Sequence, residues 1–121
     1  MNRSFEDFIA VLNSWLTDEE KKSAVIYAVG EPVQAGSRLH LPGFELTLAE
    51  DTYIAFADKQ PMANWGHAAR YIMVNKYSAE VRSVDVRFPP FGISTHLKWL
   101  ILYQPAEVPS AMTAKFEKYK G

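Results

Sequence analysis

This chain contains no cysteine, and that absence removes several kinds of chemistry at once. It excludes disulfide bonds, thiolate ligands for a metal ion and a cysteine nucleophile. A fold without disulfides depends on its hydrophobic core, and 121 residues with 48% apolar side chains are enough to form one. We therefore expect a single domain over residues 1–121, and a reducing compartment such as the cytoplasm.

The chain also has little excess of either charge: 13 basic and 14 acidic residues leave a net charge of −1. Nucleic-acid binding is driven largely by basic groups that replace counterions at phosphates, so we expect no nucleic-acid partner. Apolar runs such as Trp99–Tyr103 have the length of a strand and not of a membrane span. Acidic residues at Glu6 and Asp7 occupy the place where a signal peptide needs an apolar core. A soluble, unprocessed protein without a membrane partner is expected.

Several cofactor signatures are missing as well. The chain has no glycine-rich phosphate loop, no dinucleotide fingerprint and no paired-carboxylate spacing that points to catalysis, so no cofactor is expected. The histidines, His40, His67 and His96, fall on or beside alternate strands of the expected sheet. Because neighbouring strands lie about 4.8 Å apart, these side chains would be separated by roughly 10 Å and roughly 20 Å. Only a strongly curled or closed sheet could gather them, and we expect no metal site.

The first thirty residues carry helical patterns. Apolar side chains recur from Phe5 to Leu16 at the spacing of one helical stripe, after a capping pair at Ser4 and Asp7. A second capping signal, Thr17 with Glu20, predicts a helix that continues through residues 24–29 and stops at Gly30 and Pro32. A single bent helix is the alternative. Residues 1–30 are therefore expected to be a helical region.

From residue 38 to residue 103 the apolar pattern changes to the period of two that is typical of strands. It predicts strands over 38–48 (interrupted near residues 42–43), 53–58, 70–75, 81–88 and 96–103. Their short connections favour antiparallel pairing. Residues 110–120 predict a short helical tail. The expected fold class is α+β: one or two N-terminal helices packed on a curled antiparallel sheet of about five strands, with a short C-terminal helix.

The connection from residue 59 to residue 69 is the most informative segment, because it is longer and richer in functional side chains than a turn requires. In an up-and-down sheet it shares one end with the connection over 89–95. Aromatic and arginine side chains commonly anchor protein interfaces. We therefore predict that a protein or peptide partner binds this rim, through Trp65, Phe91, Arg70, Asn64, Pro61 and Pro90.

Two other interpretations of the same loop stay open. In the first, the protein is a small hydrolase- or lyase-like enzyme in which His67 is the general base and Asp58 orients it. Asn64 and Arg70 would then hold the substrate. In the second, the loop is a structural plug that closes the core. We favour a non-enzymatic accessory module that binds a protein or peptide. The sequence does not set its oligomeric state.

Overall fold

Two short N-terminal helices begin at the residues that the capping signals predict. The computed structural model describes residues 4–42, 44–63, 66–90 and 97–120. Helix α1 (Phe5–Trp15) begins at Ser4, whose hydroxyl accepts from the Asp7 N–H at 3.2 Å while the Asp7 carboxylate accepts from the Ser4 N–H at 2.9 Å. Helix α2 (Asp18–Ser23) begins with the same reciprocal pair of bonds at Thr17. Both predicted capping boxes are confirmed.

The second helix is shorter than predicted, and the prediction of helix over residues 24–29 is wrong. Strand β1 (Val25–Val29) occupies this segment, and all five of its side chains are buried. A short apolar run covered on both faces has no period that separates a strand from a buried helix. The β-branched residues Val25, Ile26 and Val29 suit a strand, and neighbouring strands on both sides decide the outcome.

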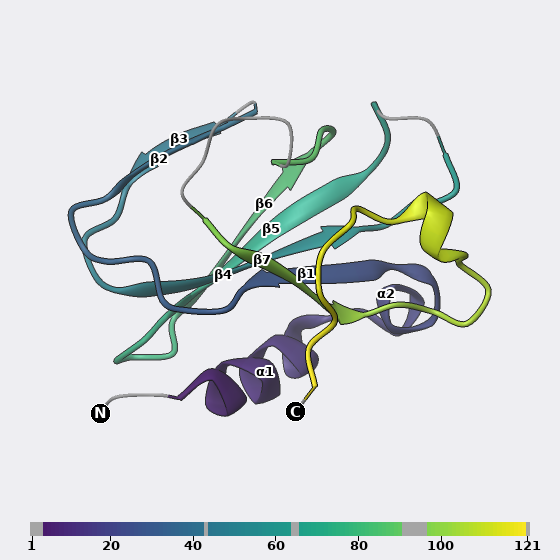
Figure 1. Ribbon diagram of the computed structural model, residues 1–121. Helices are drawn as coiled ribbons and strands as arrows, with labels where there is room; N and C mark the ends of the chain where they lie inside the picture. Colours follow the sequence, from purple (N-terminus) through teal and green to yellow (C-terminus); the bar gives the residue numbers. More distant parts are fainter. Residues whose placement is uncertain (1–3, 43, 64–65, 91–96, 121) are drawn as a thin grey trace.

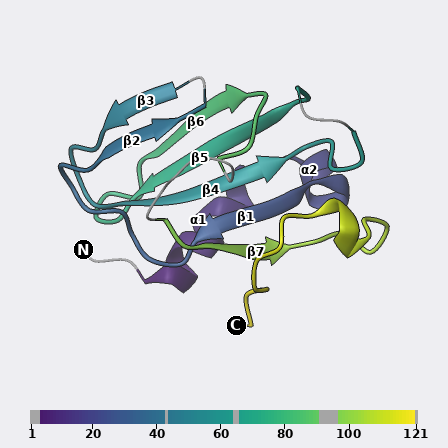
Figure 2. The ribbon, with the colours of Figure 1, turned by 45° about the horizontal axis from the view of Figure 1, so that its top comes forward.

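The main sheet has five strands in the order β6-β5-β4-β1-β7, and every neighbouring pair is antiparallel. Its other strands are β4 (Thr52–Asp58), β5 (Ala69–Asn75), β6 (Val81–Val86) and β7 (Trp99–Tyr103). The predicted α+β class and antiparallel pairing are confirmed. The expected strong curl is not found, and the sheet is open and twisted (Figures 1 and 2).

The segment predicted as one interrupted strand over 38–48 is instead a separate hairpin. Within the described residues, strands β2 (Arg38–Leu41) and β3 (Phe44–Thr47) pair only with each other. The break that the sequence marks at Pro42 is therefore a reversal of the chain and not a kink within a strand.

The predicted C-terminal helix is also wrong, because it is only a 3-10 turn over Ser110–Met112. The chain beyond it runs beside β7, where the Ile101 N–H donates to the Glu117 carbonyl at 2.9 Å and the Tyr119 N–H donates to the Ile101 carbonyl at 2.8 Å. Pairing with an exposed sheet edge satisfies backbone groups that an isolated short helix would leave to water.

Both faces of the sheet are covered. On one face, Phe8 and Leu12 of α1 pack against residues of β1, β4 and β5, as the helical stripe predicts. On the other face, the β2–β3 hairpin and the C-terminal segment cover Tyr27, Phe56 and Tyr71. Figure 1 shows α1 and the hairpin on opposite sides of the sheet. This three-layer arrangement explains why β4 is buried at every position.

The C-terminal segment is tied to the core by one buried hydroxyl, since Tyr27 Oη accepts from the Ala114 N–H at 3.0 Å. We predict that Tyr27→Phe lowers the free energy of unfolding by about 1 kcal/mol, because the bond is lost while the ring remains. Amide hydrogen exchange should accelerate at Ala114. Tyr103→Phe is the control, since its side chain is exposed. Unchanged exchange at Ala114 would contradict the assignment.

Candidate functional site

A buried pair of side chains closes the base of the loop over residues 59–68. Asp58 is the last residue of β4, and His67 lies two residues before β5. Asp58 Oδ1 and His67 Nε2 are 2.6 Å apart, and their side chains are only 4% and 5% exposed. The sequence analysis predicts this contact, because it identifies Asp58 as the residue that would orient His67. The structure contains this contact, but the contact alone does not make His67 a catalytic residue.

Burial dominates the electrostatics of this pair. It raises the pKa of Asp58, and the hydrogen bonds from His67 and from the Gln60 N–H only partly offset that effect. With Asp58 ionised, the carboxylate can only accept, so the Nε2–H of His67 is the donor. A histidine held by a carboxylate is the arrangement of an oriented general base. Its burial means that a substrate would reach His67 only after the loop moved.

Further bonds hold the first half of the loop in one shape. The Lys59 N–H donates to the Ala68 carbonyl at 3.2 Å, and the Ala68 N–H donates to the Gln60 side-chain oxygen at 3.0 Å. The Ala63 N–H donates to the Gln60 carbonyl at 3.0 Å, which closes a β-turn with Pro61 at its second position. Proline suits that position because its ring sets the required φ. Several hydrogen bonds thus hold the backbone of residues 59–63.

The second half of the loop is joined to the segment that follows β6. Gly66 has a φ of +97°, which favours glycine, and its N–H donates to the Arg87 carbonyl at 3.2 Å. The Arg87 guanidinium donates back to the Gly66 carbonyl at 3.0 Å. The two connections therefore meet at one end of the sheet, as the strand alternation predicts. The predicted anchors Asn64, Trp65 and Phe91 lie outside the described residues.

An open hollow of about 470 Å³ lies beside the first half of the loop. Met62 projects at its edge with 56% of its surface exposed, whereas Pro61 is buried. The hollow is lined by Ser23, Lys59, Gln60, Pro61, Met62, Ala63, Glu107 and Val108. Neither His67 nor Asp58 belongs to this lining. The accessible feature of the loop is consequently an apolar surface with one charge of each sign beside it.

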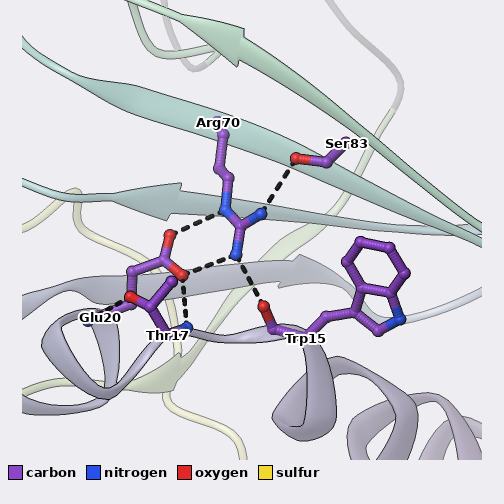
Figure 3. A network of polar contacts seen from close by, with 5 residues as sticks. All are labelled: Trp15, Thr17, Glu20, Arg70 and Ser83. Atoms are coloured by element: carbon purple, nitrogen blue, oxygen red, sulfur yellow. Dashed lines mark hydrogen bonds and ion pairs between the residues drawn. The ribbon is translucent and has the colours of Figure 1, made fainter.

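Arg70, predicted as a binding or substrate-holding residue, has its guanidinium engaged within the fold (Figure 3). It forms a two-bond contact with Glu20, at 2.8 Å from Nε and 2.6 Å from Nη2. It also donates to the Ser83 hydroxyl at 3.1 Å and to the Trp15 carbonyl at 2.9 Å. This network joins the end of α1 and the start of α2 to β5 and β6.

Strand alternation places Arg70 on the other face of the sheet from the Asp58–His67 pair. Arg70 lies opposite Ala57, and Asp58 lies opposite Ala69. Successive side chains of a strand point to opposite faces, so Arg70 faces the helices and Asp58 does not. The structure brings Asp58 and His67 together, and it does not bring Arg70 to them.

The partner of Arg70, Glu20, is the residue that sequence reasoning missed. The sequence identifies Glu20 only as a helix-capping side chain, and no local signal pairs it with a residue 50 positions later. Burial alone would raise the pKa of Glu20, but hydrogen bonds from Arg70 and from the Thr17 N–H outweigh that effect and lower it. Glu20 therefore remains ionised in the interior, because both of its carboxylate oxygens are occupied by donors.

The other predicted features are dispersed. His40 pairs with Glu45 at 3.1 Å on the exposed hairpin, Pro90 is buried, and His96 lies outside the described residues. Within the described ranges, no group of three or more histidine, aspartate or glutamate side chains is arranged to hold a metal ion. None of the helices seen in the described part of the chain is long and apolar enough to cross a membrane.

The chain matches no protein-family model, no curated protein and no solved structure. The site's own geometry is therefore the basis for any functional conclusion.

We predict that Arg70→Met lowers the free energy of unfolding by about 3–5 kcal/mol at neutral pH, because it leaves the Glu20 carboxylate buried without its cation. Combining Arg70→Met with Glu20→Gln should recover part of that loss. The pKa of Glu20 is lower in the folded protein than in the unfolded protein. Its ionised carboxylate therefore stabilises the fold at pH values above the unfolded-state pKa, and this stabilisation is lost as the pH falls through the folded-state pKa. The cost of Arg70→Met should therefore shrink below about pH 4.

Denaturant unfolding of the single and double variants across pH 3–7 measures both effects. Lys22→Met, on the exposed surface of α2, is the control for removing a positive charge. A cost of Arg70→Met that does not change with pH would contradict the role given to Glu20.

The contact between Asp58 and His67 is expected to stabilise the loop over residues 59–68. Asp58→Ala and His67→Ala should each lower the free energy of unfolding by about 2–3 kcal/mol, because each removes the hydrogen bond between these two buried side chains. The double variant should lose less than the sum, and the Ala68 amide should exchange faster in all three. His40→Ala is the exposed control and should change stability by less than about 0.5 kcal/mol. Strict additivity of the two single effects would show that the pair does not hold the loop.

Proposed function

We propose that the protein is a small accessory module that binds a protein or a peptide, and that residues 59–63 with the adjoining hollow form its contact surface. The observation that carries this proposal is the exposed Met62 side chain on a loop whose backbone is held by several hydrogen bonds.

A loop segment whose backbone is already held by hydrogen bonds loses little conformational entropy when a partner binds, so a smaller entropic cost opposes binding. Methionine is flexible and polarizable, which suits an apolar contact with a side chain of the partner. Lys59 and Glu107 lie beside the apolar lining and offer one charge of each sign to the partner's backbone or side chains. This combination of apolar centre and polar edge is typical of protein interfaces.

The sequence-predicted anchors Trp65, Phe91 and Asn64 remain part of this proposal. They extend the same loop and the neighbouring connection, and their contribution rests on residue type alone. Arg70 is withdrawn from the contact surface, because its guanidinium is engaged with Glu20, Ser83 and Trp15.

We further propose a cytoplasmic protein that has neither a nucleic-acid nor a membrane partner, on the grounds of composition and charge.

An enzymatic function is the second candidate, and the 2.6 Å contact between Asp58 and His67 is the observation that favours it. A hydrolase- or lyase-like reaction would use His67 as the base. The burial of both side chains supports the structural role more strongly, since a general base must come within hydrogen-bond reach of its substrate.

We predict that Met62→Glu abolishes capture of the partner while leaving the melting temperature unchanged, because a charge replaces the exposed apolar contact. Tagged protein would be used to recover partners from the source cells, with quantitative mass spectrometry as the readout. Met112→Glu is the matched control, since Met112 is a similarly exposed methionine on the C-terminal 3-10 turn. The recovered partner should bind the Met62 variant at least about tenfold more weakly in a direct titration.

Equal binding of the partner by the wild type and by the Met62→Glu variant would contradict the proposed contact surface. Loss of binding in the Met112→Glu variant alone would place the interface on the C-terminal segment.

A further inference from the structure

A second hollow, on the helix-covered side of the molecule, shares no lining residue with the loop surface. It has a volume of about 370 Å³ and lies between α1, β1 and the β7 edge. Its floor is apolar and includes Leu12, Leu16, Ile26 and Leu102. This volume is at the lower end of the range for small-molecule sites in proteins, which are mostly apolar with a few polar groups.

The polar side-chain groups at the rim have no partner among the described residues. Lys21 is the one charged residue in the lining, and its ammonium group makes no ion pair with any described residue. The side-chain amide of Asn13 and the hydroxyls of Tyr103 and Tyr119 likewise make no hydrogen bond with the described part of the chain. All four groups are thus available to a ligand.

The charge at this hollow has one sign. The lining contains no carboxylate, although the chain as a whole has a net charge of −1. A hollow whose lining offers apolar contacts and a single cation is complementary to an amphipathic anion.

We propose that this hollow, called here the α1–β7 groove, binds a small aliphatic carboxylic acid. The hydrocarbon chain lies on the floor formed by Leu12, Leu16, Ile26 and Leu102, and the carboxylate meets the Lys21 ammonium. Asn13 and the two tyrosine hydroxyls donate hydrogen bonds to the carboxylate or to polar substituents near it. The site is independent of the loop surface, so either proposal can fail without the other.

Sodium octanoate is the probe, and octan-1-ol of the same chain length is its uncharged counterpart. Titrations followed by methyl nuclear magnetic resonance should show saturable shifts at Leu16, Ile26 and Leu102. Octanoate should bind about threefold more tightly than octan-1-ol, which is the size of effect expected for a partly exposed ion pair. The preference should weaken as the salt concentration rises.

Lys21→Gln should abolish the preference for octanoate over octan-1-ol while the methyl shifts persist, because the apolar floor is unchanged. Lys22→Gln is the matched control: Lys22 is the next residue of α2, is also exposed and does not line the groove. It should retain the wild-type preference. Both variants change an exposed side chain, so both should fold, and their melting temperatures check this.

Three results would overturn the proposal. The first is the absence of saturable octanoate binding, and the second is an unchanged preference in the Lys21→Gln variant. The third is sedimentation that shows self-association with the same methyl groups protected in the dimer, which would make the groove an interface between two copies of this chain.

Discussion

Coverage of the sheet on both faces is the constraint on which the rest of the structure depends. Strands β1 and β4 lie in the middle of the sheet with α1 on one side and the β2–β3 hairpin on the other (Figure 1). Every side chain of these two strands is buried. A strand buried on both faces must be apolar throughout, or its polar groups must find partners in the interior.

Two buried polar pairs follow from that constraint. At the end of β4, Asp58 is hydrogen-bonded to His67 on the hairpin-covered face, and on β5 Arg70 is paired with the Glu20 carboxylate on the helix-covered face. The first pair joins the sheet to the loop over 59–68, and the second joins it to the helices. Pairs of this kind make the position of those segments specific, because a displacement would break bonds between buried polar groups.

The surfaces left for binding are consequently at the periphery. The hollow beside Met62 and the α1–β7 groove are both open, and both are lined by apolar and polar side chains. We propose a protein or peptide partner for the first surface and a small carboxylate for the second. The different chemistry of their edges supports this division: the loop surface has one charge of each sign, and the groove has a single cation.

The sequence by itself determined the local features: both helix starts, the strands predicted over 53–58, 70–75 and 81–88, their antiparallel pairing, and the contact between Asp58 and His67. The last of these strands ends at Val86, two residues earlier than predicted. These follow from capping chemistry, from the period of two and from the closeness of the two ends of one connection. Only the tertiary structure decided that residues 25–29 form an inner strand of the sheet, that residues 38–47 form a separate hairpin, and that residues 117–119 pair with β7. Only the tertiary structure also decided that Arg70 binds Glu20 and is therefore unavailable to a partner. Each of these outcomes depends on segments far apart in the chain, which determine burial and pairing but leave no pattern in the local sequence.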